Sequence, residues 1–158
     1  MIPDDWKDLL TALTATGARF LIVGAHAMAV HGVPLGTQDL DVWIDPQPSN
    51  SERVWRALAD FGAPLDDLQI SLADLARPDT VIQLGLPPNR IDLLTTLSGL
   101  PDFQAAWADR VVHRFGEIEV PFLSRCVVDL RSLPDHCPYS AARPLFSLLS
   151  RRPLHPAS

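Results

Sequence analysis

The stretch from Arg19 to Asp45 restricts the fold more than any other part of this chain, because strand-like, turn-like and acidic patterns follow one another closely. It reads RFLIVGAHAMAVHGVPLGTQDLDVWID. The four apolar residues 20–23 are typical of a buried strand. Gly24 ends this run, and the small or apolar residues 25–32 predict a short helix. The sequence therefore predicts a strand, a glycine turn and a helix before the acidic segment begins.

The acidic segment alternates with period two, as a strand does. One face carries Asp39, Asp41, Trp43 and Asp45, and the other carries Leu40, Val42 and Ile44. At a rise of roughly 3.3 Å per residue, Asp39 and Asp41 lie about 7 Å apart at Cα, so their carboxylates can converge on one or two divalent cations. The alternative is an ordinary strand with one solvated face. Asp45, which precedes a proline turn, is expected at the surface.

The glycine turn complements this acidic pair. Backbone N–H groups at the start of a helix, together with the helix dipole, favour phosphate oxygens. Gly24 and Ala25 are the candidates for this role. The alternative is that Gly24 only permits a tight turn. The interval 19–45 thus combines a candidate phosphate cradle with a candidate metal-binding pair.

A third carboxylate lies further along the chain. Two runs, 80–84 and 90–95, flank a proline-containing turn and predict a β-hairpin. Asp92 lies among apolar residues of the second run, where burial is costly unless the carboxylate is paired or metal-bound. One interpretation is metal ligation beside Asp39 and Asp41. The other is a salt bridge to Arg90 or another arginine.

Other elements follow from helical periodicity and from breaker residues. The predicted helices are 4–16, a helix capped by Asn50 or Ser51 and closed by Gly62, 65–76 and 103–111; two short strands are predicted at 111–115 and 117–120. These elements form one predicted domain over residues 1–124. The segment 125–158 has five prolines and five arginines against two aspartates, and we predict a loosely ordered tail.

Composition narrows the classes of function. Of 158 residues, 47% are hydrophobic and 20% are charged, as in a globular protein. A formal charge of −6 leaves no basic footprint for nonspecific nucleic-acid binding, and the single lysine, Lys7, argues against a lysine phosphate clamp. There is no Walker A sequence and no G-x-S-x-G anchor for a serine nucleophile.

Cysteine, histidine and apolar patterns point to no zinc site and no membrane span. Cys126 and Cys137 lack CxxC spacing, and His26 and His31 are five residues apart rather than four, so we interpret both histidines as core or surface residues. No stretch reaches 18 uninterrupted apolar residues, and the N-terminus is acidic where a signal peptide would be basic. We therefore expect a cytoplasmic protein with no membrane partner.

With these motifs in place, the chain resembles the nucleotidyltransferase superfamily that shares the DNA polymerase β fold. More closely, it looks like the small bacterial nucleotidyltransferases of the DUF6036 and AbiEii-toxin-like type. The matching segments are FLIVGAHAMAVHG, TQDLDVWIDP and PPNRIDLLT, within residues 15–124. The resemblance implies an α+β fold in which a mixed sheet of about five strands is flanked by helices.

The resemblance also implies a reaction. A nucleoside triphosphate would donate an NMP group to a hydroxyl of an RNA, a protein or a small molecule, with Mg²⁺ or Mn²⁺ held by Asp39, Asp41 and Asp92. Gly24 and Ala25 would receive phosphate oxygens, and Thr37 would assist the phosphate or, equally, cap its turn. A role beside a cognate toxin or antitoxin is expected from the same resemblance.

Three departures from the family pattern favour an alternative function. Ala25 stands where relatives carry serine or glycine, Leu35 stands where they often carry arginine, and the segment after Arg125 has no counterpart in the family. We hypothesise that the C-terminus has been replaced, for example by a frameshift. The alternative is therefore a catalytically impaired module that binds a nucleotide or a partner protein without turnover. A further alternative is an acidic protein whose aspartates are plain surface.

Overall fold

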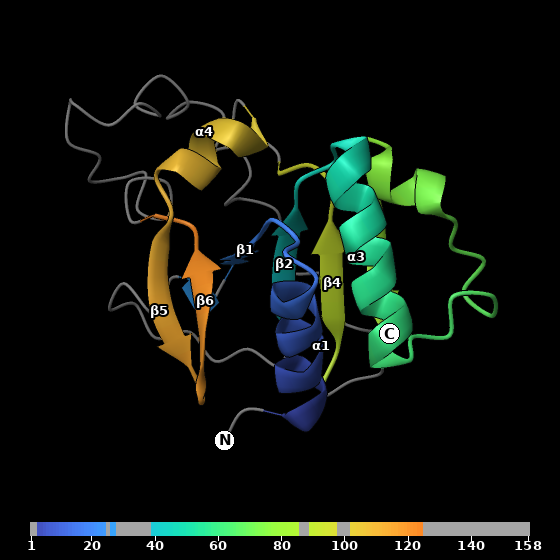
Figure 1. The fold of residues 1–158 in the computed structure, drawn as a ribbon, viewed down its shortest axis with the longest axis horizontal. Helices are drawn as coiled ribbons and strands as arrows, with labels where there is room; N and C mark the ends of the chain where they lie inside the picture. The colour runs from blue at the N-terminus through green and yellow to red at the C-terminus, as the bar shows by residue number, and fades with distance from the viewer. Residues whose placement is uncertain (1–2, 25, 28–38, 86–88, 98–101, 125–158) are drawn as a thin grey trace, which may run out of the picture.

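The computed structural model describes residues 3–24, 26–27, 39–85, 89–97 and 102–124, which form helices around a mixed β-sheet (Figure 1). The helical elements are α1 (Asp4–Ala15), α3 (Pro48–Phe61), the 3₁₀ helix η1 (Leu72–Ala76) and α4 (Phe103–Ala108). The strands are β1 (Phe20–Val23), β2 (Leu40–Ile44), β3 (Val81–Leu84), β4 (Ile91–Leu94), β5 (Val111–Phe115) and β6 (Ile118–Phe122). Within these described ranges, no helix has the length and apolar character that a membrane crossing requires.

The six strands form one sheet in the order β3-β4-β2-β1-β6-β5. The pairs β1–β2, β3–β4 and β5–β6 are antiparallel, whereas β1–β6 and β2–β4 are parallel. The predicted α+β class with a mixed sheet flanked by helices is confirmed, with six strands rather than about five. The parallel β2–β4 pair matters most for function, because it aligns two acidic segments that lie about fifty residues apart in sequence.

Helices α1 and α3 pack together across one face of the sheet (Figure 1). Residues of β2 and β4 on this face are register partners: Leu40 opposes Ile91, and Val42 opposes Leu93. All four are 0–2% exposed. We call this side the helix-covered face. Burying each such side chain contributes about 1.5–3 kcal/mol, so this face supplies much of the core.

The opposite side of β2 carries Asp41 and Trp43, and we call it the acidic face. Trp43 is buried against Phe103 of α4, with ring centroids 5.1 Å apart in an edge-to-face arrangement. Helix α4 therefore covers the Trp43 end of the acidic face. Asp102 caps α4 by accepting a hydrogen bond from the backbone N–H of Ala105 at 2.8 Å.

The start of α3 corrects a prediction. The helix begins at Pro48, so Asn50 and Ser51 lie inside it and cap nothing. The buried Asn50 side chain instead accepts a hydrogen bond from Arg19 N at 2.7 Å and donates to the carbonyls of Arg19 and Asp45 at 3.0 and 2.9 Å. Asn50 thus ties the entry of β1 to the exit of β2. The predicted closure at Gly62, in the left-handed region with φ 88°, is confirmed.

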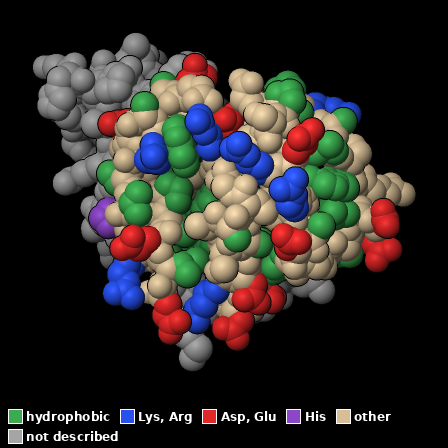
Figure 2. All heavy atoms as spheres, in the orientation of Figure 1, with side chains coloured by type: hydrophobic (Ala, Val, Ile, Leu, Met, Phe, Trp, Pro, Cys, Tyr) green, Lys and Arg blue, Asp and Glu red, His purple; other side chains and the backbone are tan. Residues whose placement is uncertain are grey.

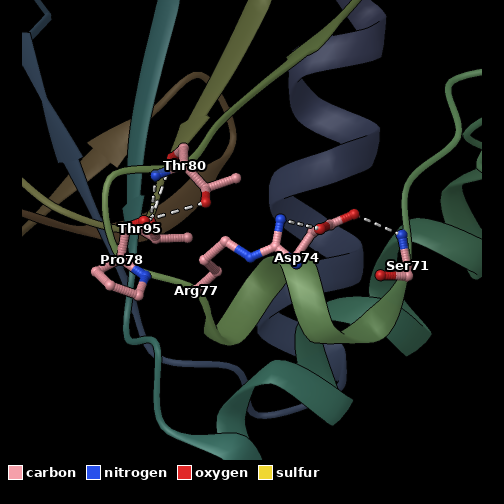
Figure 3. Close-up of polar contacts among 6 residues, drawn as sticks. All are labelled: Ser71, Asp74, Arg77, Pro78, Thr80 and Thr95. Atoms are coloured by element: carbon pink, nitrogen blue, oxygen red, sulfur yellow. Dashed lines mark hydrogen bonds and ion pairs between the residues drawn. The ribbon is translucent and has the colours of Figure 1, made fainter.

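The predicted helix over 65–76 is mostly wrong, since the described backbone is helical only in the 3₁₀ segment Leu72–Ala76. A capping box begins this segment, and Asp74 Oδ2 accepts a hydrogen bond from Ser71 N at 2.9 Å (Figure 3). Asp74 also pairs with Arg77 at 3.1 Å. Beyond it, Thr95 Oγ1 accepts a hydrogen bond from Thr80 N at 3.0 Å at the open end of the β3–β4 hairpin (Figure 3).

The remaining element boundaries differ little from the predictions. The predicted hairpin is confirmed as the antiparallel β3–β4 pair. Helix α4 ends at Ala108, before the predicted end at 111, because the chain turns there into β5. Strand β6 runs to Phe122 instead of 120, and Pro121 takes part in its pairing with β5. The predicted helix 25–32 is observed only as helical backbone at Gly24, His26 and Ala27, and its other residues lie outside the described ranges.

The surface above α1 and α3 shows acidic and basic side chains mixed together rather than a field of one sign (Figure 2). This mixture agrees with the modest negative charge of −6 for the whole chain. The face shown in Figure 2 therefore presents no field of one sign that would steer a polyanion towards it.

Candidate functional site

Asp41 and Asp92 lie side by side on the acidic face. They are Cα partners in the parallel β2–β4 pair, and register partners on adjacent strands project to the same side of a sheet. The same row of register partners crosses the neighbouring strands. Val23 of β1 is the partner of Asp41 on one side, and Gln83 of β3 is the partner of Asp92 on the other. The structure thus makes two of the three predicted acidic residues direct neighbours.

Gly24 lies directly against Asp41. Its backbone has φ +71°, in the region that favours glycine, and a methyl group added there would overlap the Asp41 carboxylate. Gly24 also follows β1 and begins the helical backbone that continues at His26 and Ala27. A glycine at this position therefore serves both the turn and the approach of the carboxylate. The glycine turn and the acidic cluster belong to one site.

Asp39 enters the cluster through Arg90. It lies one residue before the Leu40–Ile91 register pair, which places it across from Arg90 at the start of β4. Arg90 Nη2 donates to Asp39 Oδ2 at 3.1 Å, and Leu40 N donates to the carbonyl of Arg90 at 3.0 Å. Asp39 is the more exposed acid, with 38% of its side chain accessible.

Arg90 also contacts Asp92, with 3.3 Å between Nε and Oδ1. Only 13% of the Asp92 side chain is accessible, so the ion pair is largely shielded from solvent. The two atoms are within ion-pair distance, but their geometry is not that of a hydrogen bond, and neither has a hydrogen-bond partner among the described residues. The salt bridge that the sequence offered as the alternative for Asp92 is present in this structure.

Burial and neighbouring charges change the acidity of two carboxylates in the cluster, Asp41 and Asp92. Burial, followed by the negative charges of Asp92 and Asp39, raises the pKa of Asp41 to about 6, while Arg90 opposes the rise. Burial also raises the pKa of Asp92, against the lowering effect of Arg90 and with a smaller rise from Asp39. In both cases removal from water disfavours the charged form. The cluster therefore holds more negative charge than a single guanidinium compensates.

His26 closes the site on the side of α1. Its ring packs edge-to-face against Trp6 and Phe115, with centroids 5.0 and 5.6 Å away. Burial lowers the pKa of His26, and a hydrogen bond to the backbone of Asp39 partly opposes that effect. The sequence interpretation of His26 as a core or surface residue did not anticipate this link to Asp39. The ring is a half-buried packing residue that fixes the segment before β2.

Other predicted site residues divide into those that the structure describes and those that it does not. Ala25, Thr37, Leu35 and the segment 125–158 lie outside the described ranges. The predicted surface position of Asp45 is wrong: it is 3% exposed. Its carboxylate accepts hydrogen bonds from Gln47 N at 3.2 Å and from Gln104 Nε2 at 3.0 Å, so it joins β2 to α4.

The contact between Arg90 and Asp39 was missed from the sequence, although Arg90 was considered as a partner of Asp92. A signal existed in the alternation of Arg90, just before β4, and Asp92 within it, which places both on the same side of the extended chain. The missing information was the parallel alignment of β4 with β2, which no local pattern specifies. Only that register brings Arg90 opposite Asp39.

The donor set fits a hard divalent cation in its chemistry. Carboxylate oxygens suit Mg²⁺, which keeps several waters and uses one or two protein carboxylates together with substrate phosphates. Asp92 Oδ1 is a buried oxygen without a hydrogen-bond partner among the described residues, as a ligand atom awaiting a cation would be. Across those same residues, however, no three acidic, histidine or cysteine side chains are gathered as a ready metal site.

One solved structure resembles this chain along nearly its whole length. It is the crystal structure of a "putative nucleotidyltransferase" from Thermotoga maritima, with a TM-score of 0.56 and 14% sequence identity. The alignment covers 96% of this chain and 97% of the other. No family model and no curated protein matches the sequence. At this identity the likeness shows the fold: the two proteins share an α+β architecture, here with Asp41 and Asp92 adjacent at its centre.

Proposed function

We propose that this protein is a metal-dependent nucleotidyltransferase that transfers an NMP group from a nucleoside triphosphate to a hydroxyl group. The observation that carries the proposal is the adjacency of Asp41 and Asp92, with Asp41 lying against the Gly24 turn. A carboxylate pair and free backbone N–H groups are the two elements that a triphosphate–metal complex requires. The fold shared with the Thermotoga protein supports the same class.

In this proposal, Asp39, Asp41 and Asp92 hold Mg²⁺ or Mn²⁺. When bound, the cation neutralises the triphosphate and the developing charge on the leaving pyrophosphate. Gly24 and Ala25 offer backbone N–H groups to phosphate oxygens, and Thr37 assists in binding the phosphate. These roles agree with the position of Gly24 beside Asp41.

The chemical step needs a base for the acceptor. The acceptor oxygen forms a bond to the α-phosphorus, the bond to the pyrophosphate oxygen breaks, and the acceptor proton passes to a carboxylate. We assign this proton to Asp92, because its buried Oδ1 has no hydrogen-bond partner among the described residues and can therefore accept one. Asp41 remains in its ligand role beside Gly24.

The experiment that tests the proposal uses labelled nucleoside triphosphates with Mg²⁺ or Mn²⁺ and the purified protein. Asp41→Asn and Asp92→Asn preserve side-chain size, and each should lower label transfer at least about a hundredfold, as loss of a metal-binding or proton-accepting group does. Asp60→Asn on the exposed side of α3 is the matched control and should leave transfer unchanged. Transfer that survives both active-site substitutions would remove the assignment.

A second candidate function rests on the ion pairs of Arg90. A guanidinium that satisfies Asp39 and Asp92 permanently would leave a module that binds a nucleotide or partner protein without turnover. Nucleotide-dependent thermal stabilisation without label transfer, unchanged by divalent cations, would favour this candidate. The resemblance to AbiEii-type toxins extends the first proposal to a toxin–antitoxin pair. Growth arrest on expression, rescued by a neighbouring gene and lost in Asp41→Asn, would support that role.

A further inference from the structure

Arg90 is the basic residue at the centre of the acidic cluster. It leads into β4, and its guanidinium contacts carboxylates from two segments: Asp39 before β2 at 3.1 Å and Asp92 within β4 at 3.3 Å. About a third of the Arg90 side chain is accessible. One side chain therefore engages two of the three acids assigned to metal binding.

The contact between Arg90 and Asp92 is weaker than a strong arginine–carboxylate pair. Strong arginine–carboxylate pairs are bidentate and about 2.7–2.9 Å long. Here the Arg90 contacts are longer, 3.1 Å to Asp39 and 3.3 Å to Asp92, and the contact between Arg90 Nε and Asp92 Oδ1 lacks hydrogen-bond geometry. A monovalent guanidinium also leaves the third acid, Asp41, without an ion pair of its own among the described residues. This arrangement compensates charge but holds Asp92 less firmly than a bidentate pair would.

We propose that Arg90 is an internal counter-cation that occupies the acidic cluster in the metal-free protein and leaves Asp39 and Asp92 when a divalent cation enters. The guanidinium and the metal are then alternative occupants of the same carboxylates. This explains why the described acids fit a cation chemically yet are not gathered as a ready metal site. The inference rests on the proposed function, because it takes these acids as the metal ligands.

The proposal has a measurable consequence for affinity. When only a fraction of molecules has its ligands free, the apparent dissociation constant rises by the reciprocal of that fraction. Removing the competing guanidinium should therefore tighten metal binding. If Arg90 holds the acids in about nine molecules of ten, Arg90→Met should bind Mn²⁺ about tenfold more tightly than the unmodified protein.

Isothermal titration with Mn²⁺ alone, without nucleotide, tests this on the full chain. Arg90→Lys is the decisive second variant, because it keeps the positive charge but lacks the planar fork that reaches two carboxylates. If the Arg90 guanidinium occupies the acids, the Mn²⁺ affinity of Arg90→Lys should shift towards that of Arg90→Met. Arg77→Met is the matched control, since Arg77 pairs with Asp74 at 3.1 Å outside the cluster, and it should leave the affinity unchanged.

Thermal unfolding provides an independent readout. Without metal, the melting temperature of Arg90→Met should lie below that of the unmodified protein, because three carboxylates then repel one another. Saturating Mn²⁺ should reduce this difference in melting temperature. Equal Mn²⁺ affinity in Arg90→Met and the unmodified protein would overturn the proposal. So would tighter binding in Arg90→Met with no change in Arg90→Lys, since that pattern reflects charge at a distance. If Arg90→Met does not fold, Arg90→Lys carries the test.

The same data separate this inference from the function on which it rests. Equal affinity with label transfer that still depends on Asp41 would remove the counter-cation role alone. Absence of Mn²⁺ binding in every variant would remove both the counter-cation role and the metal-dependent reaction. Tighter binding in both Arg90 variants with a narrowed stability gap would establish the competition.

Discussion

The two faces of β2 and β4 are built for different purposes. On the helix-covered face, Leu40 and Val42 oppose Ile91 and Leu93 and are almost fully buried. On the acidic face, the same register sets Asp41 against Asp92, and burial there disfavours the charge that the site needs. One alignment of two strands thus stabilises the fold on one side and stores electrostatic repulsion on the other. Substitutions on the two faces should accordingly change stability in opposite directions.

The largest effect should come from the helix-covered face. Leu40→Ala removes a fully buried side chain beneath the helices and leaves a cavity, so the free energy of unfolding should fall by about 3 kcal/mol. Urea denaturation followed by circular dichroism measures the change. A loss below about 1 kcal/mol would show that the helices collapse onto the space, and that this face is less tightly packed than its burial implies.

A slightly smaller loss of unfolding free energy is expected where the Gly24 turn meets the acidic face. Gly24→Ala places a methyl group against the Asp41 carboxylate and forces an alanine to φ +71°, so we expect a loss of about 2–3 kcal/mol. Gly62→Ala is the informative control, since Gly62 also has positive φ but a Cβ there meets nothing within 4 Å. If the free energy of unfolding falls equally in both variants, the backbone conformation alone accounts for the loss and the contact with the Asp41 carboxylate contributes nothing.

On the acidic face, a substitution should raise the free energy of unfolding instead of lowering it. The pKa of Asp41 is raised in the folded protein, to about 6 from 3.8, so its charged form destabilises the fold as pH rises through that interval. Asp41→Asn should therefore unfold at a higher denaturant concentration than the unmodified protein at pH 7.5. After allowance for solvent screening, we expect a gain of about 1–2 kcal/mol.

The pH dependence checks the origin of this gain. The advantage of Asp41→Asn should grow between pH 3.8 and about 6 and stay constant above that, because the carboxyl of the folded protein is protonated at the acidic end. Denaturation series at several pH values give the difference directly. An advantage independent of pH would mean that the amide improves packing or hydrogen bonding rather than removing a charge.

The smallest change in the free energy of unfolding is expected at the outer edge of the sheet. Val81 of β3 is 55% exposed, although it is β-branched and apolar like the core residues. Val81→Thr keeps the branched shape and should change the free energy of unfolding by less than about 0.5 kcal/mol. The same denaturation assay compares it with Leu40→Ala. A loss similar to that of Leu40→Ala would show that Val81 contributes to a buried contact in solution.

Local patterns predicted much of this architecture. The β3–β4 hairpin, the apolar strand before Gly24 and the closure of α3 at Gly62 all follow from alternation and breaker residues within a few positions. The start of α3 and the segment 65–76 were predicted wrongly. In the first case, Asn50 is used for a long-range tie between β1 and β2 instead of a cap. In the second, mixed acidic and apolar residues carry only a weak helical signal.

The candidate site shows the same division. Alternation identified Asp39 and Asp41, and the cost of burying a carboxylate among apolar residues identified Asp92; the assignment of these acids as metal ligands stays a prediction. Burial of Asp45 could not be predicted, because its partner Gln104 comes from a helix about sixty residues away. Nor could the bridge from Arg90 to Asp39, which depends on the alignment of two strands.

The sequence by itself determined which side chains share a face of each strand, because the period of two is a property of the backbone within a few residues. Only the tertiary structure decided that the acidic faces of β2 and β4 coincide, with Arg90 between Asp39 and Asp92. The physical reason is that strand register is set by hydrogen bonds and packing between distant segments, and a shift of one residue would have turned Asp92 into the core.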